Sequence, residues 1–521
     1  MKLKSKNLAA IDIGTNSFHL IVVKVKDDGN FEIIDREKEV IRLSEGSTGD
    51  IKFIKPEAAI RAIACLKRFK VIADSHNSTI RAVATSAVRE SNNKNDFIEQ
   101  VYKQTGIEIE VISGYEEARL IYLGILKAVP IYNKKALVFD IGGGSTEFVV
   151  GSKGKMLQTV SLKIGAVRLA QKFFPDFEIT NSRIKDCRKW VEGEIFHASE
   201  VMKQEGFNVC SGSSGTIMAA GLMIQAMRNG GSISSQTILN NFEFSKDELK
   251  EIEKEILNRK TIDKRKKIPG LDEKRADIVP AGIIILSTIF DLFGLEKMTI
   301  SGYALREGIV IDTLQKEHIN GSTKPNLIDI RKESIKHLSE SCNYDREHCR
   351  YITGFALKIF DDLKNLHQLG DECREYLEAS SILHDIGYHI AHTNHHHHSY
   401  YIIRNSELLG FNDSEIGIIA HTSRYHRKSH PKKSHDEFTE LPERNQLIIK
   451  KLSAILRVAD SLDRTHKRII QSVECRVKRS SVELYLEIRK NSNPEIELWS
   501  LERRKGLFEE IFDKTLQVSL G

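Results

Sequence analysis

The sequence predicts an α/β protein in which two similar α/β domains are followed by an all-helical domain and a small α/β tail. Three observations support this prediction. Strand-like and helix-like apolar patterns alternate along the first third of the chain, a glycine-rich hairpin pattern occurs twice, and the pattern becomes almost entirely helical after about residue 310. The length of 521 residues is enough for roughly three or four domains of about 150 residues each.

The first third of the chain reads as strands and helices in alternation. Residues 8–13 and 18–25 are short apolar runs on either side of a turn, and residues 31–43 alternate as a strand does. Residues 56–72 have helical apolar spacing and begin with a proline, which favours the first turn of a helix. Residues 79–84 read as a buried strand. This mixture indicates an α/β domain and not a helical bundle.

An internal repeat defines the second domain. LAAIDIGTNSFHLIVVKV at 8–25 recurs in outline as ALVFDIGGGSTEFVVGSK at 136–153. Each copy has an apolar run, Asp-Ile-Gly, a small polar turn and a second apolar run, which predicts a β-hairpin. A repeat at this separation indicates a duplicated domain and not a solenoid. We therefore expect two similar domains that face each other.

The C-terminal part has a different character. Residues 325–470 are helical in pattern and rich in histidine, and GSTKPN at 321–326 reads as a linker. Strands return from about residue 470 and continue into IELWS at 496–500, and a helical tail is expected from Leu501. The expected boundaries are 1–130 and 131–312 for the two similar domains, 320–470 for the helical domain and 471–521 for the tail.

Composition restricts the class of protein. The chain is 40% hydrophobic and 29% charged with only 9 prolines, which excludes a disordered or collagen-like protein. No apolar run approaches the roughly 18 residues of a membrane span. The 7 cysteines are scattered and include no CxxC pair, which indicates free thiols in a reducing compartment. We expect a soluble cytoplasmic protein without membrane contact.

The charge is unevenly distributed. The formal net charge of +6 lies in residues 1–310, because the rest of the chain is balanced. Two basic clusters stand out, RKTIDKRKK at 259–267 and RYHRKSHPKK at 424–433. Each is either a solvated surface or part of a path for a polyanion. Charge alone does not separate nucleic acid from another polyphosphate, and we predict no specific nucleic-acid partner.

The two repeated turns carry the strongest chemical signal. Glycine lets the backbone approach a ligand and turn N–H groups toward it, and hydroxyl side chains add donors, which suits phosphate oxygens. The aspartates suit Mg²⁺, which prefers a few carboxylates together with phosphate oxygens. Asp140 is therefore a candidate metal ligand. The candidate phosphate-binding residues are Asp12, Gly14, Thr15, Asn16 and Ser17 in the first turn, and Gly142, Gly143, Gly144, Ser145 and Thr146 in the second.

A third Ser/Gly stretch, CSGSSGT at 210–216, precedes an apolar helical segment. It reads either as another phosphate loop at a helix N-terminus or as the capped start of a helix. Its candidate phosphate-binding residues are Gly212, Ser213, Ser214 and Gly215.

These motifs resemble a known family. The two turns resemble the phosphate motifs of the actin and sugar-kinase (ASKHA, ribonuclease H-like) superfamily, which implies two actin-like domains. The details resemble the exopolyphosphatase and guanosine pentaphosphate phosphohydrolase (Ppx/GppA) family, and the resemblance covers nearly the whole chain. The segments that carry it are AIDIGTNSFHLIV, ATSAVRESNN, VISGYEEARLIYLG, FDIGGGSTEFVV, SGSSGTI and ISGYALREGIV, with RYHRK farther along the chain.

The resemblance assigns roles to individual residues. The two catalytic glutamates of the family fall on Glu117 in GYEEARL and Glu147 in GGGSTE, and Glu147 also suits Mg²⁺ (or Mn²⁺) beside Asp140. Glu117 is expected to act as the base or to orient water, with its neighbour Glu116 as rival. Taken alone, Glu117 reads as an ordinary carboxylate at a helix N-terminus. Arg89 matches a family arginine expected to clamp a phosphate, although a lone arginine after a strand is more often a surface ion-pair partner.

The helical region has a second constellation, in the order His, His-Asp, Asp. This order resembles the HD phosphohydrolase superfamily, whose ligands on helices bind one divalent metal, and it implies an HD-like domain with a second divalent metal. Members of the Ppx/GppA family often lack the full ligand set here and use the domain for polyphosphate binding and dimer contacts. The four residues are His348, His384, Asp385 and Asp460, and the imidazoles considered for a further ion are His395, His398 and His421.

The resemblance implies an exopolyphosphatase that hydrolyses terminal phosphoanhydride bonds of inorganic polyphosphate and releases orthophosphate. The reaction is expected to depend on Mg²⁺, to use water positioned by glutamates, and to take place in a homodimer. The nearest alternative is hydrolysis of guanosine pentaphosphate (pppGpp) to ppGpp at the same cleft. An ATP-dependent kinase or switch would need an adenosine pocket. A non-enzymatic binder of polyphosphate or nucleic acid would not need carboxylates beside an anionic ligand.

Overall fold

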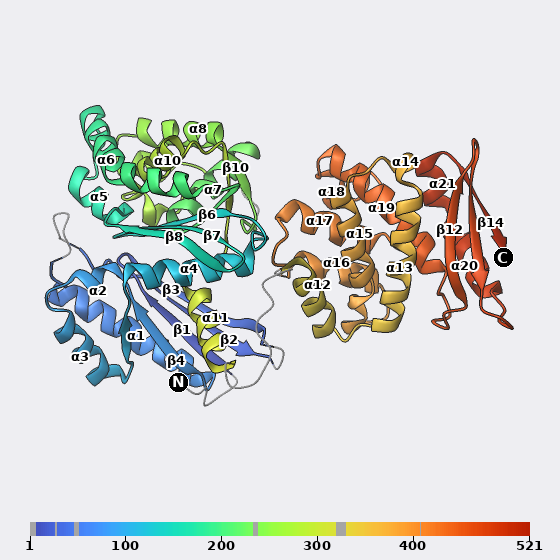
Figure 1. Cartoon of the computed structure of the whole chain (residues 1–521), viewed down its shortest axis with the longest axis horizontal. Helices are drawn as coiled ribbons and strands as arrows, with labels where there is room; N and C mark the ends of the chain where they lie inside the picture. The colour runs from blue at the N-terminus through green and yellow to red at the C-terminus, as the bar shows by residue number, and fades with distance from the viewer. Residues whose placement is uncertain are drawn as a thin grey trace. The chain divides into compact units, whose positions relative to one another are not determined.

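The computed structural model describes residues 7–26, 29–45, 52–232, 238–318, 330–406 and 408–520 (Figure 1). The predicted linker at 321–326 lies outside these residues. The chain divides into two compact units, Met1–Ile330 and Arg331–Gly521, and each is described by itself. Within the described ranges, no helix combines the length and the apolar character needed to span a membrane. The cysteines are all buried free thiols.

The first sheet of the N-terminal unit has five strands in the order β3-β2-β1-β4-β5. The first three strands pair antiparallel, and β4 and β5 continue the sheet parallel to β1. This mixed sheet confirms the predicted α/β class. Its strands are β1 (Asn7–Ile13), β2 (Ser17–Val25), β3 (Phe31–Val40), β4 (Thr79–Ala84) and β5 (Ile109–Val111).

Three helices accompany this sheet: α1 (Pro56–Ser75), α2 (Ser86–Glu90) and α3 (Lys94–Thr105). Helix α1 begins with Pro56, as predicted, because the fixed φ of proline fits the first helical position. It buries Ala62, Leu66 and Phe69, which recur every three or four residues and therefore lie on one face. That face joins the apolar core of the first sheet.

The second sheet repeats the topology of the first. Its order is β8-β7-β6-β9-β11-β10, so the hairpin β6–β7 and the strands β8, β9 and β11 take the places of β1–β2, β3, β4 and β5. The predicted duplication is therefore visible in the strand order, and the two actin-like domains are confirmed. The strands are β6 (Ala136–Ile141), β7 (Thr146–Ser152), β8 (Lys155–Leu162), β9 (Val209–Ser213), β10 (Glu243–Ser245) and β11 (Lys297–Ile300).

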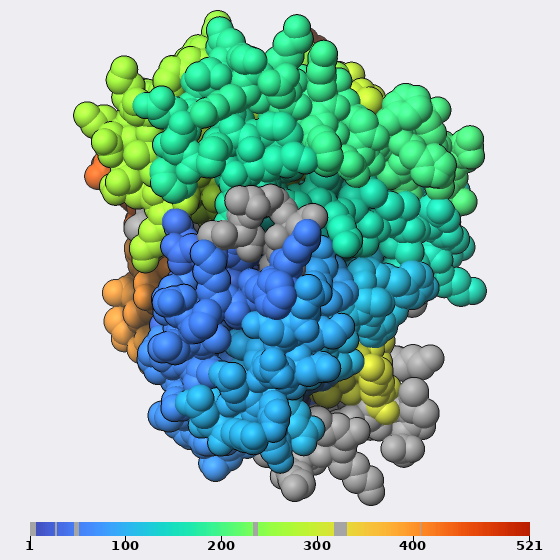
Figure 2. Space-filling model, turned by 90° about the vertical axis from the view of Figure 1, so that its left-hand side faces the viewer, coloured from blue at the N-terminus to red at the C-terminus, as the bar shows by residue number. Residues whose placement is uncertain are grey.

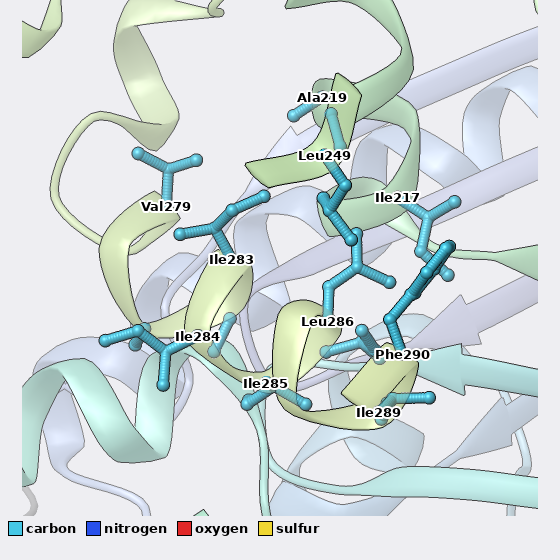
Figure 3. Close-up of a cluster of buried hydrophobic side chains, with 14 of the residues drawn as sticks. Ile217, Ala219, Leu249, Val279, Ile283, Ile284, Ile285, Leu286, Ile289 and Phe290 are labelled. Atoms are coloured by element: carbon cyan, nitrogen blue, oxygen red, sulfur yellow. The ribbon is translucent and has the colours of Figure 1, made fainter. Parts of the chain in front are cut away.

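The helices of the second domain enclose a large apolar core around α10 (Val279–Phe293). Figure 3 shows that Ile283, Ile284 and Leu286 point to different sides of α10, because this helix is apolar and buried all round. The other helices of this domain are α5 (Ala166–Phe173), α6 (Asn181–Glu205), α7 (Gly215–Arg228), α8 (Lys246–Asn258), α9 (Ile262–Arg265) and the short 3₁₀ helix η1 (Glu273–Arg275).

A pair of helices joins the two domains. Helix α4 (Gly114–Ala128) packs along α11 (Leu305–His318), and Gly124 and Gly308 each lie so close to the facing backbone that a Cβ atom would not fit. Helix α4 also contacts β7 and β8, whereas α11 contacts β1 and β2. Figure 2 shows the blue first domain against the green second domain. The expected boundary at 312 falls inside α11, and the boundaries within each unit stay predictions.

The C-terminal unit is helical in its first part, as predicted. Its helices are α12 (Ile330–Ser341), α13 (Arg346–Asp362), α14 (Lys364–His367), α15 (Asp371–Leu383), η2 (Ile386–His389), α16 (His395–Arg404), α17 (Asp413–Arg424), α18 (Asp436–Thr439) and α19 (Glu443–Ser461). Helix α19 contacts α13, α15 and α17, so it lies at the centre of this group.

The tail is a small α/β arrangement, as expected. It has the strands β12 (Ile470–Val477), β13 (Ser481–Ile488) and β14 (Thr515–Leu520), with α20 (Glu495–Arg504) and α21 (Gly506–Phe512). The prediction of a strand at 496–500 was wrong. These residues belong to α20, which buries Glu497, Ser500 and Leu501 at helical spacing and packs on α19. The last described element is also a strand, β14, and not a helical tail.

Candidate active site

A cavity of about 410 Å³ opens where the two hairpins meet. Both glycine-rich turns, the β9–α7 turn and the start of α4 line it. The sequence-predicted residues that line it are Asp12, Gly14, Thr15, Asn16, Ser17, Glu117, Asp140, Gly142, Gly143, Gly144, Ser145, Ser213, Ser214 and Gly215. Four predicted residues, Arg89, Thr146, Glu147 and Gly212, lie behind this lining.

The two glycine-rich turns lie against each other. A Cβ atom on Gly144 would come within 2.6 Å of Ser86 Oγ and 2.8 Å of Thr15 Oγ1. The β6–β7 turn is closed by the N–H of Gly142, which donates to the carbonyl of Ser145 at 2.9 Å. Glycine is therefore required at residue 144 by the close approach of the first domain, and not by an unusual backbone angle.

The third Ser/Gly stretch forms the capped start of a helix, which was one of its two predicted readings, and its reading as a phosphate loop stays a prediction. Ser214 caps α7, since its Oγ accepts the N–H of Ile217 at 3.2 Å, and the first turn of α7 faces the cavity. Ser214 has a φ of 125°, which is strained for a residue with a side chain. Gly212 does not face the cavity, because a Cβ there would meet Met298 Cε at 2.6 Å in the core.

Four carboxyl groups gather at the inner end of the cavity. Asp12 and Asp140 line its floor, and Glu117 and Glu147 are buried. Burial raises the pKa of Asp12 to about 7 and that of Asp140 to about 7. Burial also raises the pKa of Glu117, and it raises that of Glu147 well above the usual range, helped by the charges of Glu117 and Asp140. Each group holds its proton more strongly than in water, because ionised carboxylates in a buried site are costly unless a cation is present.

Glu117 is held in place by an arginine. Arg89 Nη1 donates to Glu117 Oε2 at 2.9 Å and to the carbonyl of Ile112 at 2.9 Å. Arg89 therefore positions Glu117 and does not line the cavity itself. Glu116, the rival of Glu117, faces elsewhere, because both of its carboxylate oxygens accept from Arg119, at 2.7 and 2.8 Å.

Neighbouring residues on β7 face opposite ways. Glu147 lies opposite Asp140 in the β6–β7 ladder and accepts from Ser161 Oγ at 2.9 Å. Thr146 turns its hydroxyl to the carbonyl of Ile164 at 2.7 Å and is fully buried. Its hydroxyl is thus already engaged, and the geometry does not place it among the phosphate donors.

The cavity is also lined by basic side chains that are not among the candidate residues of the sequence analysis: His19, Lys38, Arg275 and Arg306. His19 lies between Ser17 Oγ, at 2.9 Å from its Nε2, and Arg306 Nη1, at 3.3 Å from its Nδ1. Burial and the charge of Arg306 lower the pKa of His19 well below its usual range. The guanidinium of Arg275 covers Gly215 at the start of α7. His19 and Arg306 belong to sequence motifs quoted above, so those motifs could have identified them as candidates. Lys38 belongs to none of these motifs.

The first basic cluster does not form a track into the cavity. Arg265 is fully buried and donates to the carbonyls of Ala276 and Phe177, each at 2.7 Å. Arg259, the residue after α8, pairs with Glu255 of that helix. These residues fasten the chain between α8 and α10 instead of facing a ligand.

The helical quartet comes together as its sequence order predicts. His348 Nε2 and His384 Nε2 lie 3.6 and 3.8 Å from Asp460 Oδ1, and His384 Nε2 lies 3.3 Å from Asp385 Oδ2. Of the further imidazoles, His395 lies at Asp385. His398 is half-buried, and His421 packs against Tyr400 and Phe438 instead. Sequence reasoning missed His426, which stands in the quoted RYHRK segment and is 3.6 Å from Asp385.

Solved structures resemble this chain. An exopolyphosphatase from Cytophaga hutchinsonii is 29% identical, with a TM-score of 0.54, over 60% of this chain and 98% of its own. A Ppx/GppA family member from Aquifex aeolicus is 27% identical, with a TM-score of 0.50, over 60% of this chain and 99% of its own. An exopolyphosphatase-like protein is 25% identical, with a TM-score of 0.53, over 60% of this chain and 99% of its own.

Family models match both units of the chain. The model of the Ppx/GppA phosphatase family matches residues 21–317, which begin within β2 and include the whole second domain. The model of Ppx/GppA phosphatase domain III matches residues 330–505, which include the helical region. With both matches and the duplicated hairpins around one cavity, the chain belongs to the Ppx/GppA phosphatase family.

Proposed function

We propose that this phosphatase removes the terminal phosphate of inorganic polyphosphate by hydrolysis. The observation that carries the proposal is a single cavity in which two glycine-rich turns and the start of α7 face the carboxyl groups of Asp12, Glu117 and Asp140, with Glu147 opposite Asp140 in the β6–β7 ladder. The turns and the helix N-terminus suit an anionic phosphate. The carboxyl groups suit a base and a bound cation.

Glu117 is the best placed base. It lines the cavity, one of its oxygens is fixed by Arg89, and burial raises its proton affinity. A water molecule attacks the terminal phosphorus while Glu117 takes one of its protons. The bond between that phosphorus and the bridging oxygen breaks, and its electron pair stays on the shortened chain. Arg89 acts through Glu117 and is a positioning residue.

Asp140 and Glu147 would hold Mg²⁺, with Asp12 across the cavity. Their oxygens form a hard donor set that fits Mg²⁺ or Mn²⁺, and burial, which raises their pKa values, makes their charged forms costly unless a cation is bound. When bound, the ion would neutralise charge on the phosphates.

The homodimer and the cytoplasmic location stay predictions. We also propose one divalent ion at His348, His384, Asp385 and Asp460.

Hydrolysis of pppGpp is the second candidate, because one wall of the cavity is apolar. Met218, Ala219 and Leu222 of α7 line it with Leu305 of α11. Polyphosphate has no apolar part, whereas a nucleoside would contact such a wall. An ATP-dependent kinase could use the same wall, and it would transfer phosphate to an acceptor instead of releasing it.

The deciding experiment measures phosphate release with Mg²⁺ from long-chain polyphosphate and from pppGpp, at equal concentrations of chain ends. The proposal expects faster release from polyphosphate and loss of release in Glu117→Gln. Glu116→Gln is the matched control, because Glu116 is the adjacent residue and pairs with Arg119. Faster release from pppGpp would select the second candidate. Phosphate transfer from ATP, or binding without release, would contradict both.

A further inference from the structure

The backbone carbonyls of the second glycine-rich turn accept hydrogen bonds from the chain segment that follows β8. The carbonyl of Gly142 accepts the N–H of Ala166 at 3.0 Å, and that of Gly143 accepts the backbone N–H of Arg168 at 3.1 Å. The carbonyl of Gly144 accepts the N–H at Nε of the Arg168 side chain at 2.8 Å. Among the described residues, the N–H groups of Gly143 and Gly144 donate to no backbone carbonyl, and both residues line the cavity. The segment after β8 thus engages the carbonyls of the turn and leaves N–H groups for an anion.

The first glycine-rich turn is held in the same way by the segment that follows β3. The carbonyl of Thr15 accepts the N–H of Leu43 at 2.9 Å, and the carbonyl of Asn16 accepts the N–H of Arg42 at 2.9 Å. Strands β3 and β8 occupy equivalent places in the two sheets. The duplication therefore includes the segment that supports each turn, and each of these two segments contains an arginine.

Each of the two arginines forms an ion pair with a carboxylate of the opposite domain. Arg168 Nη2, in the second domain, donates to Oε1 of Glu90 at the end of α2 in the first domain, at 2.9 Å. Arg42 Nη2, in the first domain, lies 2.8 Å from Oδ2 of Asp277, which precedes α10 in the second domain. The two arginine bridges, Arg168–Glu90 and Arg42–Asp277, therefore join the two domains in opposite directions.

Burial distinguishes the two arginine bridges. The side chains of Arg168 and Glu90 are only 5% and 13% exposed, so loss of either would leave a buried charge without its partner. Arg42 is 39% exposed, and solvent weakens its ion pair. Lys163 Nζ also lies 3.3 Å from Glu90 Oε2, but the lysine is 73% exposed and does not replace Arg168. Arg168–Glu90 is therefore the better bridge to test.

Helix α2 connects this bridge to the carboxyl group proposed as the base. Arg89 and Glu90 are the last two residues of α2, which has only five residues. Arg89 Nη1 donates to Glu117 Oε2 at 2.9 Å, while Glu90 accepts from Arg168. A continuous series of contacts therefore runs from Glu117 through Arg89 and Glu90 to Arg168, and from there to the carbonyl of Gly144. A shift of α2 would move both ends of this series relative to each other.

We propose that Arg168 is a positioning residue that, through Glu90, sets the distance between the second glycine-rich turn and Glu117. Arg168 does not line the cavity, so it acts through the groups that it holds. The inference rests on the proposed function, because it takes the turn as the phosphate site and Glu117 as the base. A displacement of about 1 Å between reacting groups can lower the rate by about 10²-fold, so loss of the bridge should reduce catalysis without removing any group that contacts the substrate.

The test measures kcat/KM for phosphate release from polyphosphate by the full-length chain with Mg²⁺. Arg168→Met should lower kcat/KM by roughly 10- to 10²-fold, and Arg168→Lys, which keeps a positive charge beside Glu90, should recover part of the loss. The double variant Arg168→Met with Glu90→Ala should be no worse than Arg168→Met, because the bridge is already lost. Arg188→Met is the matched control, since Arg188 pairs with Glu253 between α6 and α8 outside the cavity lining. It should lower Tm and leave kcat/KM unchanged.

The positioning role is wrong if folded Arg168→Met keeps the kcat/KM of the unchanged protein, or if Arg188→Met lowers kcat/KM as much. It is also wrong if the effects of Arg168→Met and Glu90→Ala multiply as independent changes do. Should circular dichroism show that Arg168→Met is unfolded, Arg42→Met makes the same comparison at the other bridge.

Failure of the proposed function gives a different result. In that case the unchanged protein releases phosphate from neither polyphosphate nor pppGpp. Binding of inorganic phosphate, measured by calorimetry, then replaces kcat/KM as the readout. Weaker binding by Arg168→Met would support the positioning of the turn, and equal binding by Arg168→Met and the unchanged protein would overturn it.

Discussion

Replacing Asp140 by asparagine should stabilise the N-terminal unit while abolishing phosphate release. Asparagine keeps the shape of the side chain and an oxygen for the hydroxyl of Ser213, which donates to Asp140 Oδ2 at 2.6 Å. It removes a charge that the surroundings do not compensate, since burial raises the pKa of Asp140 from 3.8 to about 7. Each tenfold change in proton affinity is worth about 1.4 kcal/mol, so the raised pKa corresponds to a loss of folding stability of at most about 4 kcal/mol.

The effect has a defined dependence on pH. Above pH 7 the carboxylate is ionised in both the folded and the unfolded chain, so the folded protein bears the full cost. As pH falls from about 7 toward 3.8, Asp140 keeps a proton in the folded state that it releases in the unfolded state. The loss of folding stability caused by its ionisation therefore becomes smaller. The advantage of Asp140→Asn should therefore fall from at most about 4 kcal/mol at pH 8 to roughly 2 kcal/mol at pH 5. It should vanish where both states are protonated.

The assay is urea unfolding in EDTA, followed by tryptophan fluorescence. The chain has 2 tryptophans, Trp190 in α6 and Trp499 in α20, so a Trp499→Phe background reports on the N-terminal unit alone. Asp263→Asn is the control, because the Asp263 side chain is 84% exposed. Lower stability of Asp140→Asn at pH 8, or a difference that does not change with pH, would refute the reasoning. Added Mg²⁺ should stabilise the unchanged protein and have a smaller effect on Asp140→Asn.

Three further predictions concern catalysis. Glu117→Gln should lower kcat at least about 10²-fold, as expected for loss of a general base, whereas near-normal turnover would move the role to Glu116 or Glu147. Gly144→Ala should raise KM for polyphosphate, because the new methyl group would press on two hydroxyls of the first domain. Gly193→Ala is the control and should leave KM unchanged, because a Cβ at Gly193 meets nothing within 4 Å. Equal kinetics for the two variants would disprove the close approach at Gly144. Chelation of divalent ions should stop phosphate release and Mg²⁺ should restore it, so full activity in EDTA would exclude the proposed ion.

The sequence predicted the parts of the site that depend on local pattern. The two hairpins follow from alternating apolar residues and glycine-rich turns, and their aspartates occupy the same place in each copy. Strand alternation could also have shown that Thr146 and Glu147 face opposite sides, because successive side chains in a strand do so. Asp140 and Glu147 pair across the ladder, so only Glu147 belongs with the aspartate that lines the cavity.

Other parts of the site depend on contacts between distant segments, which no local pattern contains. Arg89 was expected to clamp phosphate, but the turn of α2 aims its guanidinium at Glu117, 28 residues later in the chain. Arg306 reaches His19 from 287 residues away. The prediction of a strand at 496–500 was wrong because a short apolar run fits either a strand or a helix. Packing against α19 selected the helix.

The duplicated hairpins carry different side chains at equivalent positions, and this difference makes the two sides of the site chemically unlike. In the first hairpin Asp12 pairs with His19, and in the second Asp140 pairs with Glu147. One copy thus sets an imidazole beside Arg306, and the other sets a second carboxylate beside Asp140. An imidazole and a guanidinium favour an anion, whereas two carboxylates favour a cation. A symmetric pair of either kind would attract only the phosphate or only the ion. Under the proposed function, the substitution of one residue between the copies would therefore allow the site to hold both the phosphate and the ion.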